Sequence, residues 1–363
     1  MALTLHGTVA DNTTVLSRQN AKPLIINGGM TVAQRGTVTG ITNPGTYTLD
    51  RIRADIRGGF GVQVAQSTDV PSGYGFGNSL KLDVTTADTS PDADGLLLLG
   101  YHFEGQDVQL LKYGTSSAET TTVAFWIKSN KTGTFQCNLR MADAYNIGQL
   151  VTISSANTWE KKVITFVGNT SNAMANDNSD ELRIQFFFDA GSNHEGGGVP
   201  SSWAAVSATK DYNGSIDLGD NTANEVLITG LQMEVGSFDA NSIASFQHES
   251  FGNNLARCQR YCQVYGAYGN MMIGAGMTQN ATIAYRWGLP LIVEMRANPS
   301  GALSGTCNLW NGAIGANAAL GTSYNKTDFA SYDMTCDSGL TATTGLIMML
   351  FLNTGTLTLT AEL

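Results

Sequence analysis

The sequence has little charge and few histidines, and it lacks the motifs of common enzyme families. Lys, Arg, Asp and Glu make up 14% of its 363 residues, against roughly 25% in an average globular protein. Nucleophile elbows, glycine-rich phosphate loops, HExxH helices and zinc-ligand spacings are all missing. The four histidines, at positions 6, 102, 194 and 248, are not spaced as metal ligands. We therefore expect no enzyme, but a structural or binding protein.

Long basic and long apolar runs are also missing. The net charge is −10 and no run of Lys or Arg exceeds two residues, which argues against nucleic-acid binding. The first residues lack the basic start and apolar centre of a signal peptide, so we expect no secretion by that route. The most apolar run, Gly345–Leu352, has the length of a strand, so we expect no membrane insertion.

Cysteine is scarce, and its spacing does not indicate a metal site. The five cysteines are an odd number and form no CxxC pair. Cys258 and Cys262 lie one helical turn apart, but no histidine lies beside them and a zinc site needs four ligands. We expect free thiols, a reducing cytoplasm for assembly, and no cofactor.

Calcium is the one metal that the sequence leaves open. Asp92–Gly95 begins like a calcium loop, and Asn176–Glu181 is a second acidic loop. The first lacks the later ligands, and solvated turns explain both loops as well. A structural calcium ion is thus an open alternative.

Glycine, by contrast, is abundant, and alternating apolar residues accompany it. There are 41 glycines, as expected for many short strands joined by tight turns. Val123, Phe125 and Ile127 alternate with Ala124, Trp126 and Lys128, which is the period-two pattern of a strand. Eight to ten such strands predict a jelly-roll β-sandwich over residues 23–249.

One helix is expected, at residues 250–265, between two β domains. Its apolar stripe comprises Leu255, Cys258, Cys262 and Tyr265, spaced three and four residues apart. The stripe predicts packing either against a neighbouring copy or between the domains. The fold class is therefore all-β: an arm (1–22), the jelly-roll sandwich, the linking helix, and a second, smaller β-sandwich domain (266–363).

Aromatic residues near loops are candidates for binding sugar, because the apolar face of a sugar ring stacks on aromatic rings. These candidates are Tyr74, Tyr101, Trp126, Trp159 and Trp203. The alternative is that they complete the sandwich core. Glu104 and Asp107 are a possible carboxylate pair for glycoside hydrolysis, but a turn between two strands explains them without catalysis.

Nine segments in order resemble tail-fibre and related virion structural proteins of tailed bacteriophages, notably marine and cyanobacterial ones. They cover about residues 24–265 and read LIINGGMTVAQRGT, YTLDR, SLKLDVTTAD, FEGQD, LKYGT, VAFWIKSNKTGTF, NTWEKKVITFVGNT, ITGLQMEVGS and FGNNLARCQRYCQ. The resemblance implies a carbohydrate-binding-like jelly-roll mounted on a virion, commonly as a homotrimer. It brings no catalytic motif.

The resulting expectation is a virion protein, most simply a tail fibre or similar appendage. Its N-terminal arm would bind other virion proteins, and its copies would bind a host-surface glycan multivalently. Two alternatives stay open: a purely structural virion subunit without a ligand, and a polysaccharide depolymerase.

Overall fold

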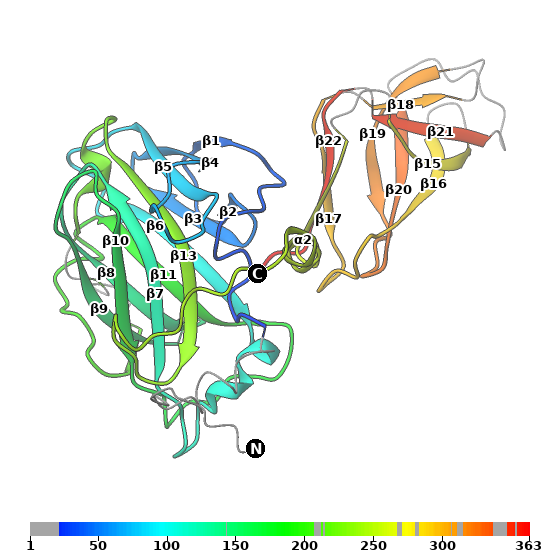
Figure 1. The fold of residues 1–363 in the computed structure, drawn as a ribbon. Helices are drawn as coiled ribbons and strands as arrows, with labels where there is room; N and C mark the ends of the chain where they lie inside the picture. The colour runs from blue at the N-terminus through cyan, green and yellow to red at the C-terminus, as the bar shows by residue number, and fades with distance from the viewer. Residues whose placement is uncertain are drawn as a thin grey trace, which may run out of the picture.

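The structure is a computed structural model that describes residues 22–142, 144–206, 212, 215–266, 271–279, 283–305, 307–310, 315–336, 347–352 and 354–363. Its regular secondary structure is almost entirely strand, with one α-helix, α2 (Phe251–Gln259), in the described part. Figure 1 shows a large sandwich on one side of α2 and a smaller β domain on the other. The expected arm lies outside the described residues, apart from Lys22. No described helix is long and apolar enough to cross a membrane.

The large domain is a sandwich of two antiparallel sheets. Sheet A has the order β1 (Val38–Ile41), β4 (Gly61–Ser67), β5 (Ser79–Thr86), β13 (Glu225–Val235), β7 (Thr121–Ser129) and β10 (Glu160–Phe166). Sheet B has the order β12 (Ala204–Ala205), β9 (Tyr145–Ile153), β8 (Gly133–Met141), β11 (Asp180–Ala190), β6 (Leu96–Glu104), β3 (Ile52–Arg57) and β2 (Thr46–Tyr47). The chain passes repeatedly between the sheets, so most pairings join distant segments.

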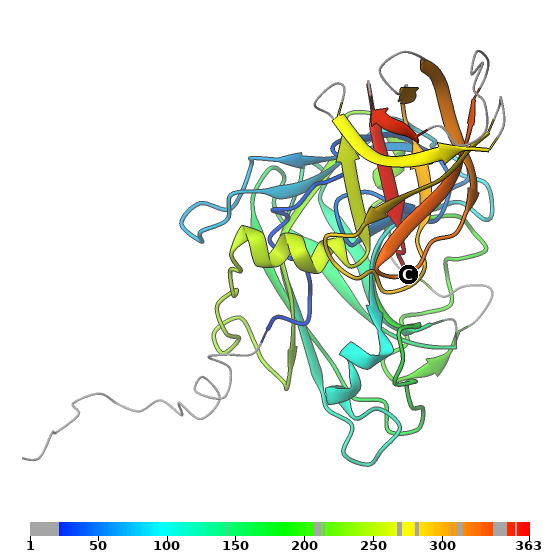
Figure 2. The same cartoon turned by 90° about the vertical axis from the view of Figure 1, so that its right-hand side faces the viewer.

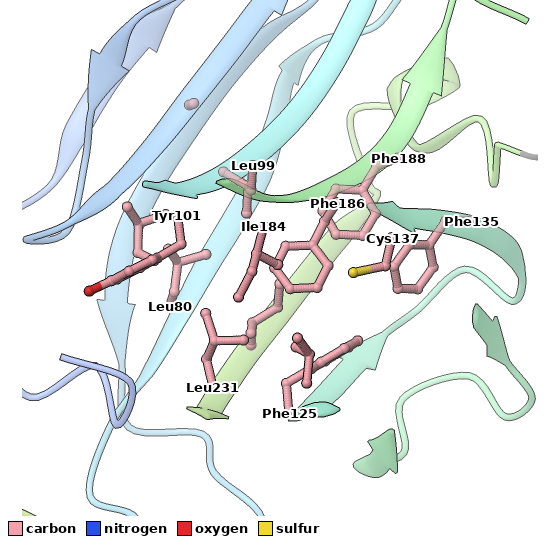
Figure 3. Close-up of a cluster of buried hydrophobic side chains, with 14 of the residues drawn as sticks. Leu80, Leu99, Tyr101, Phe125, Phe135, Cys137, Ile184, Phe186, Phe188 and Leu231 are labelled. Atoms are coloured by element: carbon pink, nitrogen blue, oxygen red, sulfur yellow. The ribbon is translucent and has the colours of Figure 1, made fainter. Parts of the chain in front are cut away.

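Apolar side chains from both sheets fill the space between them, as the alternating pattern predicts. Phe125 of β7 meets Phe186 of β11 edge to face, with 4.9 Å between the ring centroids. Figure 3 shows Leu80 and Leu231 of sheet A facing Leu99, Tyr101 and Ile184 of sheet B. This contact between facing sheets buries each strand's apolar side and stabilises the sandwich.

The smaller domain combines a three-stranded sheet with a barrel. The sheet has the order β14 (Cys262–Gly266), β22 (Thr356–Thr360) and β17 (Ser300–Leu303). The barrel closes through β15 (Met271–Thr278), β16 (Ile283–Pro290), β20 (Phe329–Cys336), β19 (Gly315–Ser323), β18 (Cys307–Trp310) and β21 (Ile347–Leu352). The predicted all-β class is confirmed. The sequence did not predict that this sheet closes into a barrel, because inward and outward residues alternate along the strands of open and closed sheets alike.

The linking helix is shorter than predicted. Ser250 caps α2 as expected, with its hydroxyl accepting the Asn253 N–H at 3.4 Å. The helix ends at Gln259, however, and Cys262 and Tyr265 lie on β14, opposite Thr360 and Leu357 of β22. Strand pairing with a segment nearly a hundred residues later overrides the local helical spacing. The prediction of a helix through residue 265 is therefore wrong, and the smaller domain begins with β14.

Leu255 and Cys258 nevertheless pack inside the chain. Cys258 is fully buried in a cluster with Ile26, Val32 and Tyr261, against which Leu255 packs. Tyr265 belongs to the separate core of the smaller domain. Leu255 and Cys258 therefore belong to one core and Tyr265 to another, with α2 held against the first described segment of the sandwich.

A buried ionic contact joins the two domains beside α2. Glu362 of the smaller domain pairs with Arg35 at 2.9 Å and with Arg51 at 2.7 Å. The side chains of Arg51 and Glu362 are 1% and 4% exposed. Arg51 also donates to the His102 carbonyl at 2.5 Å, and its guanidinium lies 3.5 Å from the centroid of the Tyr261 ring. Figure 1 shows the C-terminal end of the chain between the two domains, and Figure 2 shows the molecule with the smaller domain toward the viewer.

A second ion pair lies at the same junction. Arg260 donates from Nε and Nη2 to the carboxylate of Glu104, at 3.0 and 2.8 Å. Arg296 of the smaller domain donates to the Asn178 carbonyl of the sandwich at 2.6 Å. Several polar contacts thus fix the domains relative to each other.

We expect Glu362→Gln to lower the free energy of unfolding by about 3 kcal/mol, because it leaves two buried guanidinium groups without a carboxylate. Urea unfolding measures this change. The control is Lys112→Gln, which removes an exposed ion pair with Glu119 and should cost less than about 1 kcal/mol. Equal, small effects for both variants would show that the junction contributes little.

Candidate functional site

The outer face of sheet A carries alternating aromatic and basic side chains along β7 and β10. Phe125 and Ile127 point into the core, so Trp126 and Lys128 point outward. Lys161 of β10 lies opposite Trp126. Trp159 precedes Lys161 by two residues and shares its face. We call Asp69, Tyr74, Trp126, Lys128, Trp159 and Lys161 the β7–β10 patch.

A loop places Tyr74 over Trp126. Their ring centroids are 4.3 Å apart, with 49° between the ring planes, and Tyr74 is 56% exposed. The loop is held at its end by Thr229 of β13, whose hydroxyl donates to the Asn78 carbonyl at 2.8 Å. Thr229 itself lies opposite Trp126 in the sheet. The exposed ring of Tyr74 and the half-buried ring of Trp126 therefore form an aromatic surface fixed to the sandwich.

Asp69 orients the basic and aromatic groups beside these rings. Its carboxylate accepts from Lys128 Nζ at 2.6 Å and from Trp159 Nε1 at 2.9 Å. The hydrogen bond from Lys128 lowers the pKa of Asp69, and the Trp159 indole adds to this effect. Asp69 is consequently a carboxylate at neutral pH, and it neutralises Lys128.

Aromatic residues from the β13–α2 connection border the patch. Phe76 lies 5.1 Å from both Phe246 and His248, between ring centroids. Gly230, with φ of +61°, lies beneath them at a bulge in β13. A Cβ atom there would lie 2.6 Å from Phe76 and 3.1 Å from Trp126. Glycine therefore allows both rings to lie close over β13.

The structure brings together three of the five predicted sugar-binding residues: Tyr74, Trp126 and Trp159. Tyr101 does not join them: it is 1% exposed in the core, and its hydroxyl accepts the Ile26 N–H at 2.7 Å. The prediction that Tyr101 contacts sugar is wrong, because β6 is buried on both faces. Trp203 also lies apart, donating to the Val167 carbonyl at 2.7 Å and packing edge to face on Tyr113.

Three residues of the patch, and Gly230 at its border, were not predicted as site residues: Asp69, Lys128 and Lys161. Lys128 had a usable signal, since it alternates with apolar residues on a predicted strand. Lys161 had no such signal, because Glu160 and Lys162 flank it. Asp69 and Gly230 had none, because their roles depend on contacts with distant segments.

Glu104 serves the domain junction. It is fully buried, which would raise its pKa, but the hydrogen bonds from Arg260 and Tyr261 and the charge of Arg260 together outweigh burial and hold the pKa below its usual value. Asp107 is exposed on the neighbouring 3-10 turn η1 (Gly105–Asp107). Of the two carboxylates considered for hydrolysis, Glu104 is therefore held in an ion pair and Asp107 faces solvent.

The described residues contain no group of three or more His, Cys, Asp or Glu able to hold a metal ion. In the two acidic loops considered for calcium, side chains bond within the protein. Asp94 accepts from Asn193 at 2.6 Å, and Asp177 accepts the Ser179 N–H at 2.8 Å. Carboxylate oxygens that could bind calcium thus already accept hydrogen bonds within the protein.

An open groove of about 590 Å³ lies beside α2 and includes Arg257 and Arg260 among its lining residues. Both are already paired: Arg257 with Glu249 at 2.8 Å and Arg260 with Glu104. The groove therefore offers no uncompensated arginine to a ligand, and the β7–β10 patch is the better candidate.

One carboxyl group has a strongly raised pKa. Burial raises the pKa of Asp189 to about 7, and the nearby charges of Asp217 and Glu195 act in the same direction. Its carboxylate accepts the Gly219 N–H at 2.9 Å, and the residue is 4% exposed. A general acid would need access to a substrate, which this enclosed position does not provide.

Comparisons with known proteins give remote similarities of structure. No family model matches the sequence, and no curated protein matches it. The enzymatically active domain of tailspike protein 4 from bacteriophage CBA120 is 13% identical, with a TM-score of 0.31; the match covers 59% of this chain and 21% of that one. The chain thus spans about a fifth of that tailspike domain.

Two carbohydrate-binding modules are similar at the same level. The family 11 module of Clostridium thermocellum, solved with a mixed-linked tetrasaccharide, is 10% identical (56% of this chain, 98% of that one, TM-score 0.28). TmCBM61, solved with β-1,4-galactotriose, is also 10% identical (59% and 99%, TM-score 0.28). Identities this low concern the fold alone, and function must be argued from the residues of this chain.

We expect Asp189→Asn to stabilise the protein progressively as pH rises. A carboxyl group with a raised pKa keeps its proton when folded but loses it when unfolded, so stability falls between about pH 4 and 7. One pKa unit corresponds to about 1.4 kcal/mol, so the variant should gain roughly 2–4 kcal/mol relative to the parent across this range. Urea unfolding at several pH values tests this; a pH-independent difference would contradict it.

Proposed function

We propose that this protein is a virion appendage subunit that attaches to a host surface by binding carbohydrate at the β7–β10 patch. The observation that carries the proposal is the ring pair of the exposed Tyr74 and the half-buried Trp126, which lies beside hydrogen-bonding side chains on the sheet. The virion setting rests on the resemblance to bacteriophage tail-fibre proteins, in which the N-terminal arm would bind other virion proteins.

The chemistry of the patch suits a sugar. The C–H face of a pyranose ring stacks on aromatic rings, while its hydroxyl groups need donors and acceptors at the rim. Lys128 and the Trp159 indole both donate to Asp69. The ammonium group of Lys128 keeps further N–H donors, and the carboxylate of Asp69 keeps further lone pairs, for the hydroxyl groups of a sugar. The patch lies on the open face of a sheet, so it suits a polysaccharide lying across the strands.

An open patch of this kind gives weak binding for each copy, and several copies on one particle raise the total avidity. This consideration favours an oligomer. It also makes the orientation of the patch important, since copies must reach the same surface together.

The barrel of the smaller domain carries an apolar outer face that supports self-association. Ile347 and Met277 lie opposite each other on β21 and β15, and they are 68% and 55% exposed. Met349 lies opposite Trp310 of β18, which is 45% exposed. The sequences of these three strands contain no charged residue. Copies carrying a net charge of −10 repel least where both faces are uncharged, so we propose that a second copy covers this face, within a homotrimer.

We expect Ile347→Lys, combined with Met277→Lys, to convert the oligomer to monomers, because burying two unpaired ammonium groups is costly. Light scattering coupled to gel filtration measures the mass. Leu110→Lys, at a position 45% exposed on the sandwich, is the matched control and should leave the mass unchanged. A monomeric parent protein would refute self-association.

Binding to a glycan array tests the proposed function directly. Trp126→Ala should weaken binding of the best ligand about tenfold or more, since a stacked ring contributes on the order of 1 kcal/mol beyond its buried area. Tyr324→Ala is the control, because Tyr324 is an exposed tyrosine (41%) of the smaller domain. No binding to any glycan by the parent protein would refute a carbohydrate receptor and favour a purely structural subunit.

A further inference from the structure

Three lysines point outward from sheet A, and they differ in whether a carboxylate pairs with the ammonium group. Lys81 pairs with Asp83 at 2.9 Å and with Glu225 at 2.6 Å. Lys128 pairs with Asp69 at 2.6 Å. Lys161 has no carboxylate within ion-pair distance among the residues that the structure describes. Lys161, which belongs to the β7–β10 patch, is therefore the one of these three lysines whose ammonium group is not paired with a carboxylate in the described part of the chain.

Lys161 is positioned next to both aromatic parts of the patch. It lies directly opposite Trp126 in the register of β10 and β7, where Cβ atoms are about 5 Å apart. It also follows Trp159 by two residues on the same face. Its side chain is half-buried, so its conformational freedom is limited. A ligand ring stacked on Trp126 would lie within reach of the Lys161 ammonium group.

An unpaired cation beside a stacking ring favours a negatively charged ligand over a neutral one. A carboxylate or sulfate gains more from an uncompensated ammonium group than a neutral hydroxyl group does, because the donor and the acceptor are then both charged. The charge of Lys128 is already neutralised, so the patch as a whole carries one positive charge. The overall net charge of −10 opposes an anionic ligand, but salt screens distant charges beyond about 8 Å under physiological conditions.

We propose that the β7–β10 patch binds an acidic polysaccharide, with a sugar ring stacked on Trp126 and Tyr74 and its carboxylate or sulfate paired with Lys161. This inference rests on the proposed function and names its ligand class. Lys161 makes the patch prefer acidic over neutral polysaccharides, while the aromatic rings contribute affinity for both.

Calorimetric titration of the full chain with three polysaccharides tests the inference: a polyuronate, a sulfated galactan and an unsulfated galactan. At least one acidic polymer should bind about tenfold or more tightly than the neutral galactan, and the two acidic polymers distinguish a carboxylate from a sulfate ligand. Lys161→Gln should abolish the preference for the acidic polymer over the neutral galactan. Lys161→Arg should retain it, and Trp126→Ala should weaken binding of every polymer.

Different outcomes separate this inference from the proposed function. Equal binding of acidic and neutral polymers by the parent protein would overturn the inference and leave carbohydrate binding intact. An acidic preference that survives Lys161→Gln would also overturn it, because the charge would then be recognised elsewhere. No binding of any polymer would refute both. The preference should shrink as salt rises from 50 to 500 mM, and a preference that does not respond to salt would contradict an ion pair.

Discussion

The fixed relation between the two domains depends on the carboxylate of Glu362, enclosed by Arg35 and Arg51. Because Glu362 belongs to the smaller domain and both arginines to the sandwich, separating the domains would leave buried charges without partners. Arg51 adopts a left-handed backbone conformation, with φ of +73°, which is unfavourable for a residue other than glycine. In this conformation the side chain of Arg51 contacts Glu362, the His102 carbonyl and the Tyr261 ring, and these contacts offset the backbone strain.

The same part of the chain that builds the junction also borders the candidate site. The connection from β13 to α2 carries Phe246 and His248, which contact Phe76 at the edge of the β7–β10 patch. At its other end this connection enters α2, whose Cys258 is buried at the junction. The patch and the barrel thus have a defined relative orientation. In the proposed attachment role, such an orientation would let the patches of several copies meet one surface.

Local sequence patterns predicted which residues of a strand face the core. They failed where contacts with distant segments determine burial or secondary structure. The alternation in β7 placed Trp126 outward and Phe125 inward, and both positions are confirmed. In β6 every residue is buried, so alternation could not tell that Tyr101 belongs to the core. Cys262 and Tyr265 fit a helical stripe, but β22 pairs with them as a strand. Asp69 could not be found because its partners, Lys128 and Trp159, are distant in sequence.

The burial of β6 also explains why a binding face is better sought on sheet A. On the outer side of sheet B, Leu98 and Phe187 are covered, and Tyr212 stacks on Phe187 with 3.5 Å between ring centroids. Gln136 and Asn138 of the neighbouring β8 are fully buried as well. A polymer cannot reach these groups without displacing the chain that covers them. On sheet A, by contrast, Tyr74 is already exposed, so stacking a ligand there costs little rearrangement of the protein.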